Sequence, residues 1–228
     1  MSRTVSVPAR PAALEFSPER ACLLINDMQN AFCRKGGYLD LIGFDIAGAP
    51  AVIARVRRLM DGLRAAGVTI VHSQNGFSAA RHEAPGPTSP IWHKSNALRY
   101  MRAHPEYDGK VLTHGTWDYE IAEELAPQPG DLVIPKSRDN GFAGTALDQQ
   151  LRARRIDTVI CCGISSNVGV ESNLRAAYHL EYFALMVADA TMPAGPPEVQ
   201  FATEFNVERF FGWVTQTDDL LAAVAATT

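Results

Sequence analysis

The chain has 228 residues, of which 46% are hydrophobic and 20% are charged, and its formal net charge is −4. This composition is typical of a globular protein with one large core, and we expect a single domain over residues 1–228. The acidic balance and the lack of a long basic run argue against nucleic acid as a partner.

The cysteines and the N-terminal residues indicate a reducing, aqueous environment. The four cysteines contain no CxxC pair, so neither a disulfide framework nor a zinc site is expected. Residues 1–18 hold three prolines and no apolar run long enough for a signal peptide, and we expect an extended arm there. No later stretch is long and apolar enough to span a membrane. We therefore expect a cytoplasmic protein that makes no membrane contact.

In the first part of the chain, strand-like and helix-like patterns alternate. Residues 21–27 (ACLLIND) form a short apolar run closed by polar residues, which is typical of a buried parallel strand. Apolar residues recur at helical spacing over 50–66 and Gly67 follows them, which predicts a helix that ends there. Residues 68–73 (VTIVHS) predict the second strand.

The segment 74–117 interrupts this alternation. It contains four prolines and, around 94–103, a short helical pattern. A connection of this length inside one domain is usually functional. We therefore expect the segment to form a lid over a substrate.

After the lid segment the alternation resumes. Asp118 is predicted to cap a short helix over 118–126, and Thr145 with Asp148 resembles a capping box for a helix that reaches about residue 154. Further strands are predicted at 131–136, 158–164, 183–190 and 212–217, and further helices at 168–181, 196–211 and 217–226, the last capped by Thr217. Six strands alternating with helices predict an α/β fold, three-layered and doubly wound, with a mainly parallel six-stranded sheet.

Polar residues follow several of the predicted strands. Asp27 ends the first strand and Asn75 follows the second, while Lys136 ends the third and the glycine-containing turn 163–169 follows the fourth. Ligands of open α/β sheets bind outside the carboxyl ends of the strands, so we expect these groups in one cleft. Structural roles stay open for each: Asp27 could cap a helix, Lys136 could end a strand in solvent, and Gly169 could be a packing glycine.

A resemblance to the isochorismatase-like cysteine hydrolase superfamily is carried by LLINDMQNAF and PKSRDNGFAGTALDQQLRARRIDTVICCGISSNVGVESNLRAA. Closer similarity, to the ureidoacrylate amidohydrolase branch that serves pyrimidine utilisation, is carried by GGYLDLIGFDI, QNGF, GPTSPIWHKSNAL and GTWDYE. The similarity extends from about residue 18 to about residue 220.

The resemblance implies a role for each of the converging residues. Asp27 matches the general base, and Lys136 matches a lysine whose charge favours the carboxylate and thiolate forms. The Ile164–Ser165 bond matches a cis peptide that aims the Ser165 N–H, with the N–H of residue 169, at the developing oxyanion. Gly169 itself matches the nucleophilic cysteine.

A glycine at position 169 leaves the covalent route without its nucleophile. Cys161 and Cys162 lie within a predicted strand as small buried thiols, and we do not expect either to substitute. In one account, the glycine is an engineered replacement that leaves an amidohydrolase inactive or substrate-trapping. In the other it is natural, as in the isochorismatases, which cleave a vinyl ether with the aspartate as acid. The surrounding residues match the amidohydrolase branch, so we favour the first account.

The leading functional hypothesis is cleavage of the C–N bond of ureidoacrylate or a similar ureido or carbamoyl compound. The alternatives are a vinyl-ether hydrolase that uses Asp27 as its acid and a catalytically dead ligand-binding homologue. No metal is expected, because SQNGFSAARH lacks the Asp-x-His motif of the nicotinamidases in this superfamily. The resemblance implies no cofactor, and it implies a homo-oligomer, either a dimer or a tetramer.

The lid segment supplies candidates for substrate binding. Asparagine and glutamate side chains complement the N–H groups and carbonyl of a ureido group, and aromatic rings can cover a planar conjugated acid. The candidates are Asn75, Phe77, Glu83, Trp92, Asn96 and Trp117. Either Arg81 or Arg138 is expected to pair with a substrate carboxylate.

Overall fold

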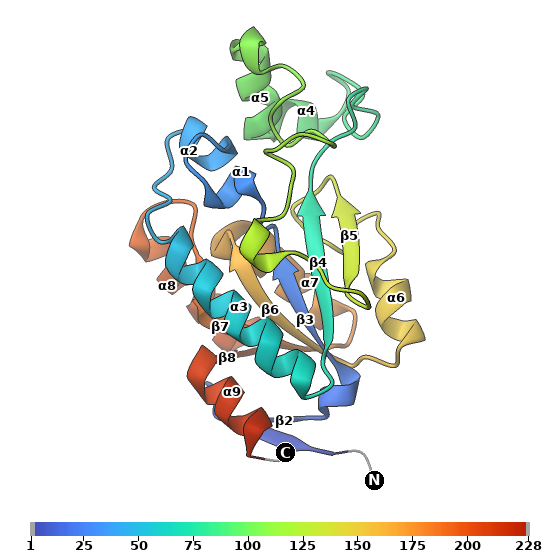
Figure 1. Ribbon diagram of the computed structural model, residues 1–228, viewed down its shortest axis with the longest axis vertical. Helices are drawn as coiled ribbons and strands as arrows, with labels where there is room; N and C mark the ends of the chain where they lie inside the picture. Colours follow the sequence, from blue (N-terminus) through green and yellow to red (C-terminus); the bar gives the residue numbers. More distant parts are fainter. Residues whose placement is uncertain (1–2, 227–228) are drawn as a thin grey trace.

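Six parallel strands form the central sheet of the computed structural model, which describes residues 3–226 (Figure 1). Their order across the sheet is β5-β4-β3-β6-β7-β8, and every neighbouring pair runs parallel. The strands are β3 (Ala21–Asn26), β4 (Thr69–Asn75), β5 (Leu132–Lys136), β6 (Thr158–Ile164), β7 (Phe183–Met192) and β8 (Trp213–Thr215). The predicted α/β fold with a mainly parallel six-stranded sheet is confirmed.

Helices cover both faces of this sheet, so each face has its own core. The helices are α1 (Asn30–Cys33), α2 (Tyr38–Leu41), α3 (Ala49–Ala65), α4 (Pro90–Lys94), α5 (Asn96–Ala103), α6 (Leu147–Ala153), α7 (Glu171–His179), α8 (Pro197–Asn206) and α9 (Thr217–Ala225). Within residues 3–226, none of them has the length and apolarity needed to cross a bilayer. Along β3, Leu23 and Ile25 enter the core with α3 and α9, whereas Cys22 and Leu24 enter the core with α6 and α7. Burial on both faces explains why β3 reads as a continuous apolar run.

The lid segment 74–117 lies beyond the carboxyl ends of the strands (Figure 1). It contains α4, α5 and a 3-10 turn at Pro105–Tyr107. The helical pattern predicted around 94–103 corresponds to α5, and α4, which was not predicted, precedes it. The helices α1 and α2, which follow β3 in the chain, lie at the same end of the sheet (Figure 1). These short elements surround the strand ends at which the candidate site was expected.

The N-terminal residues are more ordered than the predicted arm over 1–18. Within the described part, β1 (Val5–Val7) pairs antiparallel with β2 (Leu14–Phe16) in a two-stranded sheet. Val5, Val7 and the first and last residues of β2 are buried in the core that also contains α9. The segment is therefore extended in backbone but packed, because alternate apolar side chains give it one buried face.

The short helix predicted over 118–126 is absent from the structure. This stretch contains only a 3-10 turn at Glu123–Leu125. The Asp118 carboxylate instead accepts hydrogen bonds from the backbone N–H groups of Tyr38 (3.0 Å) and Leu112 (2.6 Å). Asp118 thus joins the lid to α2 through tertiary contacts, which a local capping pattern does not reveal.

Two predicted helix caps have other partners than expected. Thr145 precedes α6 and its hydroxyl oxygen accepts from the N–H of Leu147, but Asp148 does not close a capping box and accepts from a tyrosine hydroxyl. Thr217 is the first residue of α9 rather than its cap, and its hydroxyl donates to the carboxylate of Asp189 (2.9 Å). In both cases the helix itself is present and the predicted cap is wrong.

Candidate active site

A buried ion pair joins the ends of β3 and β5. Asp27 follows β3 directly with a φ of 50°, and Lys136 is the last residue of β5. The Nζ of Lys136 lies 2.7 Å from Oδ2 of Asp27, and the two side chains are 0% and 5% exposed respectively. The same ammonium donates to the carbonyl oxygens of Arg138 (3.2 Å) and Asp139 (2.9 Å). Three acceptors therefore satisfy all three N–H groups of this buried lysine.

Burial controls the titration of Asp27. It raises the pKa of the carboxyl from 3.8 to about 6, although the charge and hydrogen bond of Lys136 act in the opposite direction. The carboxylate of Asp139 raises this pKa further, and the Ser73 hydroxyl lowers it. The carboxyl can therefore hold or release a proton near neutral pH, as a general acid or base must.

The two oxygens of the Asp27 carboxyl have different surroundings. Oδ2 accepts from Lys136 and from Nδ2 of Asn26 at 3.2 Å. Among the described residues, the only side-chain donor to Oδ1 is the hydroxyl of Ser73, at 3.3 Å. Two donors stabilise negative charge on Oδ2, so a proton on this carboxyl resides on Oδ1.

The turn after β6 brings a second group of residues to this site. Gly163 has a φ of 106°, and the Ile164–Ser165 peptide bond is cis, as the family resemblance implies. The backbone then makes a π-helical turn over Ser166–Val170 and continues as α7, with the N–H of Val170 donating to the carbonyl of Ser165 (3.1 Å). Ser165 and Gly169 therefore stand at the N-terminal end of a helical segment, close to the ends of β3 and β5.

One cavity of about 260 Å³ connects these elements with the lid. Its polar lining combines the carboxyl end of the sheet with residues of the lid, and its apolar lining combines aromatic and aliphatic side chains. The polar lining residues are Asp27, Asn75, Lys94, Ser95, Asn96, Ser137, Asp139 and Ser165, and the aromatic ones are Phe32, Tyr38, Phe44 and Phe77. A small planar molecule with polar ends suits such a lining.

Three of the six substrate-binding candidates line the cavity, namely Asn75, Phe77 and Asn96. The side-chain oxygen of Asn75 is buried and accepts no hydrogen bond from any described residue. A buried acceptor without a donor costs free energy, which a ligand N–H at this position would recover.

The other three candidates lie away from the cavity lining. The Glu83 carboxylate accepts from the N–H and hydroxyl of Ser78, closing a loop within the lid. The guanidinium of Arg102 lies over the ring of Trp92, 4.2 Å from the ring centre. Trp117 is 50% exposed. These three residues belong to the lid, and none of them lines the cavity that contains Asp27.

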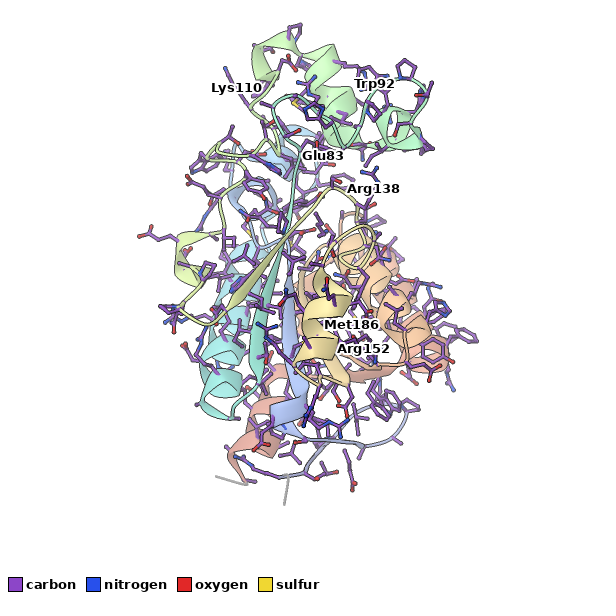
Figure 2. All side chains as sticks on the ribbon, turned by 90° about the vertical axis from the view of Figure 1, so that its right-hand side faces the viewer. Glu83, Trp92, Lys110, Arg138, Arg152 and Met186 are labelled. Carbon is purple, nitrogen blue, oxygen red and sulfur yellow. The ribbon has the colours of Figure 1, made fainter. Side chains whose placement is uncertain are left out.

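Neither arginine proposed for a substrate carboxylate lines the cavity. Arg81 forms an ion pair with Asp108, and Arg138 donates to the carbonyl of Glu83 at 3.0 Å (Figure 2). The cation that does line the cavity is Lys94, the last residue of α4, and within residues 3–226 it makes no ion pair. Sequence reasoning missed Lys94, although it lies inside the quoted motif GPTSPIWHKSNAL, two residues before Asn96.

The aromatic residues of α1, α2 and the loop after them were missed as well. Phe32 and Tyr38 pack edge to face, with ring centres 5.6 Å apart, and both line the cavity. Tyr38 and Phe44 belong to the quoted motif GGYLDLIGFDI, so the signal was present without being assigned to substrate binding.

No cysteine lines the cavity among the described residues. All four cysteines are free and buried, and Cys161 and Cys162 lie within β6. Burial raises the pKa of both thiols far above the ordinary value, which keeps them protonated and unreactive. Over residues 3–226 no group of three His, Cys, Asp or Glu side chains could hold a metal ion.

Asn26, the residue before Asp27, is fully buried at the centre of the site and was not singled out from the sequence. Its Nδ2 donates to the carbonyl of Ile164 at 2.7 Å, and its Oδ1 accepts from Nδ2 of Asn173 at 2.9 Å. The oxygen of Asn173 in turn accepts from the N–H of Gly141 at 2.6 Å. A chain of buried amides therefore connects β3, the turn after β6 and α7.

Comparison with known proteins gives consistent matches over nearly the whole chain. Residues 21–219 match the model of the isochorismatase domain. The ureidoacrylate amidohydrolase RutB of Rhizobium rhizogenes is 50% identical over 224 residues, which cover 98% of this chain and 91% of that protein. RutB of Variovorax paradoxus is 51% identical over 222 residues, covering 97% and 88%. The crystal structure of a cysteine hydrolase from Pseudomonas syringae pv. phaseolicola superposes with a TM-score of 0.77 at 26% identity, with full coverage of both chains.

Proposed function

The chain belongs to the isochorismatase family, and from that premise we propose that its cavity binds ureidoacrylate or a closely similar ureido or carbamoyl acid. Relatives of about 50% identity are named for action on ureidoacrylate, and they are hydrolases of C–N bonds. The buried, donor-free oxygen of Asn75 complements a ureido N–H, the aromatic lining complements a planar acrylate, and Lys94 complements its carboxylate.

The proposed reaction of a thiol-bearing homologue is a two-step hydrolysis. The thiolate attacks the ureido carbonyl, Asp27 takes the thiol proton, and the N–H groups of Ser165 and residue 169 stabilise the oxyanion. The C–N bond then breaks, the amine leaves with that proton, and water releases carbamate from the thiocarbamoyl enzyme. Gly169 supplies no sulfur for the first step, so we propose that this chain binds the substrate and leaves it largely intact.

The observation that carries this proposal is the buried Asp27–Lys136 pair, whose Asp27 lines one cavity together with Ser165 and Gly169. Calorimetric titration with ureidoacrylate, followed by chromatographic recovery of the ligand, tests it. We expect saturable binding and recovery of nearly all of the ligand as ureidoacrylate. Lack of binding by ureidoacrylate and by related carbamoyl acids would contradict the proposal, as would rapid cleavage by this chain.

We expect Lys94→Ala to weaken the binding of ureidoacrylate about three- to tenfold. Lys94 is exposed, so its attraction for a carboxylate is screened and the effect is moderate. Lys110→Ala is the matched control, because Lys110 also belongs to the lid (Figure 2) but does not line the cavity. Ethylurea, which lacks the carboxylate, should bind both variants as it binds the unmodified chain. An equal loss for ethylurea and ureidoacrylate in Lys94→Ala would contradict this assignment.

A second candidate function is vinyl-ether cleavage with Asp27 as the acid. It is favoured by the raised pKa of the Asp27 carboxyl, about 6, together with the lack of a thiol in the described cavity lining. An acid must be protonated, so kcat/KM for isochorismate, a vinyl ether, should be constant below pH 6 and fall about tenfold per unit above it. A kcat/KM that rises through pH 6 would show a base instead, and full activity of Asp27→Asn would exclude this function.

A further inference from the structure

The space beside Gly169 is already occupied by another side chain. A Cβ atom placed on Gly169 would lie 2.4 Å from Nδ2, 2.8 Å from Oδ1 and 2.9 Å from Cγ of Asn26. Because all three of these atoms belong to the Asn26 carboxamide, rotation of the carboxamide about the Cβ–Cγ bond does not make room for the new Cβ. Any side chain at position 169 therefore requires Asn26 itself to move.

Asn26 is not free to move without breaking buried hydrogen bonds. It is 0% exposed and donates to the carbonyl of Ile164 (2.7 Å) and to Oδ2 of Asp27 (3.2 Å). Its oxygen accepts from Asn173, which is also 0% exposed and is held by the N–H of Gly141. Displacing the Asn26 carboxamide would leave several buried polar groups without partners.

From this geometry we infer that Asn26 takes the place of the nucleophile: its carboxamide fills the volume that a side chain at position 169 would need. The inference deepens the proposed function and rests on it, since position 169 is taken as the site of the nucleophile.

A cysteine at position 169 should therefore fit the site and cleave ureidoacrylate only when the side chain of Asn26 is shortened as well. Gly169→Cys is tested alone and together with Asn26→Ala, and Asn26→Ala alone completes the double-mutant cycle. Gly169→Ala in the same two backgrounds is the matched control, because it adds the Cβ without sulfur. The readouts are the thermal midpoint Tm, ureidoacrylate turnover, and the mass of the intact protein after brief exposure to ureidoacrylate.

We expect Gly169→Cys and Gly169→Ala each to lower Tm by at least about 4 °C in the unmodified background, as overpacking of a core does. In the Asn26→Ala background the same changes should lower Tm by less than about 1 °C, which is the signature of two side chains in contact. Equal decreases of Tm in the two backgrounds would overturn the inference, whatever the turnover.

Turnover separates the inference from the proposed function. We expect the double variant Asn26→Ala/Gly169→Cys to cleave ureidoacrylate at least about 100-fold faster than Gly169→Cys alone. It should also acquire the mass of one carbamoyl group, whereas Asn26→Ala/Gly169→Ala should do neither. If Tm shows the coupling but no ureido or carbamoyl acid is cleaved, the proposed function fails while the steric pairing of Asn26 and Gly169 stands. If Gly169→Cys alone is as stable as the unmodified chain and as active as the double variant, the pairing is refuted.

Discussion

Lys136→Met is expected to lower the free energy of unfolding at pH 7 by about 3–5 kcal/mol. The substitution removes the only side chain that forms an ion pair with Asp27 in the described structure, and the Asp27 carboxylate is 5% exposed. A carboxylate left in this environment is poorly solvated, and its charge has no compensating partner. Urea denaturation followed by fluorescence measures the loss, and the slope of the transition shows whether the native state stays compact.

The pH dependence of this loss identifies Asp27 as its cause. Without Lys136 the pKa of the Asp27 carboxyl rises above its present value of about 6, while in the unfolded chain it stays near 3.8. A folded pKa above the unfolded one gives stability that is fully present below pH 3.8 and is lost as pH rises through the folded value. The deficit of Lys136→Met should therefore grow as pH rises above about 6, where Asp27 has ionised in the parent chain and stays protonated longer in the variant. Asp27→Asn/Lys136→Met should show no such growth with pH. A deficit that does not change with pH would contradict this explanation.

Gly163→Ala is expected to lower the free energy of unfolding by more than about 4 kcal/mol, or to prevent the chain from folding. The Cβ of an alanine there would lie 2.3 Å from the carbonyl oxygen and 2.8 Å from the nitrogen of Asn26. Both contacts are with the backbone of the neighbouring strand, which cannot rotate away as a side chain can. Gly163 also has a φ of 106°, which L-residues rarely adopt. The yield of soluble protein and the Tm of any folded fraction measure the effect.

Gly144→Ala is the control that separates backbone conformation from steric contact. Gly144 has a φ of 70°, and a Cβ placed on it meets no atom within 4 Å. Only the cost of a left-handed alanine remains, about 1–2 kcal/mol. If Gly163→Ala and Gly144→Ala were equally destabilising, the close approach of β6 to β3 at Asn26 would not matter for stability.

The sheet and the Asp27–Lys136 pair were predictable because their signals are local. Each strand is a short apolar run with polar residues at its end, and in a parallel sheet all such ends meet on one side. Asp27 and Lys136 stand directly at two of these ends, so their proximity followed from strand assignment alone. The structure then added the distance between the two side chains, their burial, and the direction in which the pKa of Asp27 is shifted.

The lining of the cavity was less predictable because it depends on how the lid folds. Arg81 and Lys94 are both basic residues of that segment, but Arg81 meets Asp108 whereas Lys94 reaches the cavity. The hydrogen bonds of Asp118 also depend on the fold of the lid. Its carboxylate accepts from the backbone N–H groups of Tyr38 in α2 and Leu112 in the lid, and the predicted local cap is absent. Contacts between segments that are distant in the chain leave little trace in a single sequence.

Asn26 was the most consequential omission. In the sequence it closes an apolar run, where it resembles an ordinary strand end. Its role in the site follows from its contact with Gly169, which lies in another part of the chain. Asn26 becomes informative only when the fold places its side chain in the volume beside Gly169.

The pairing of Asn26 with Gly169 also carries a historical consequence. If an ancestor carried a cysteine at position 169, the asparagine could not have been accepted first, because the two side chains claim the same volume. The mutational path therefore begins with loss of the thiol and continues with Asn26, which then forms hydrogen bonds of its own. From that point Gly169→Cys alone meets a filled site, so any recovery of the thiol has to begin with a change at Asn26. On such a path, the residue that changed last in the loss of the thiol has to change first in its recovery.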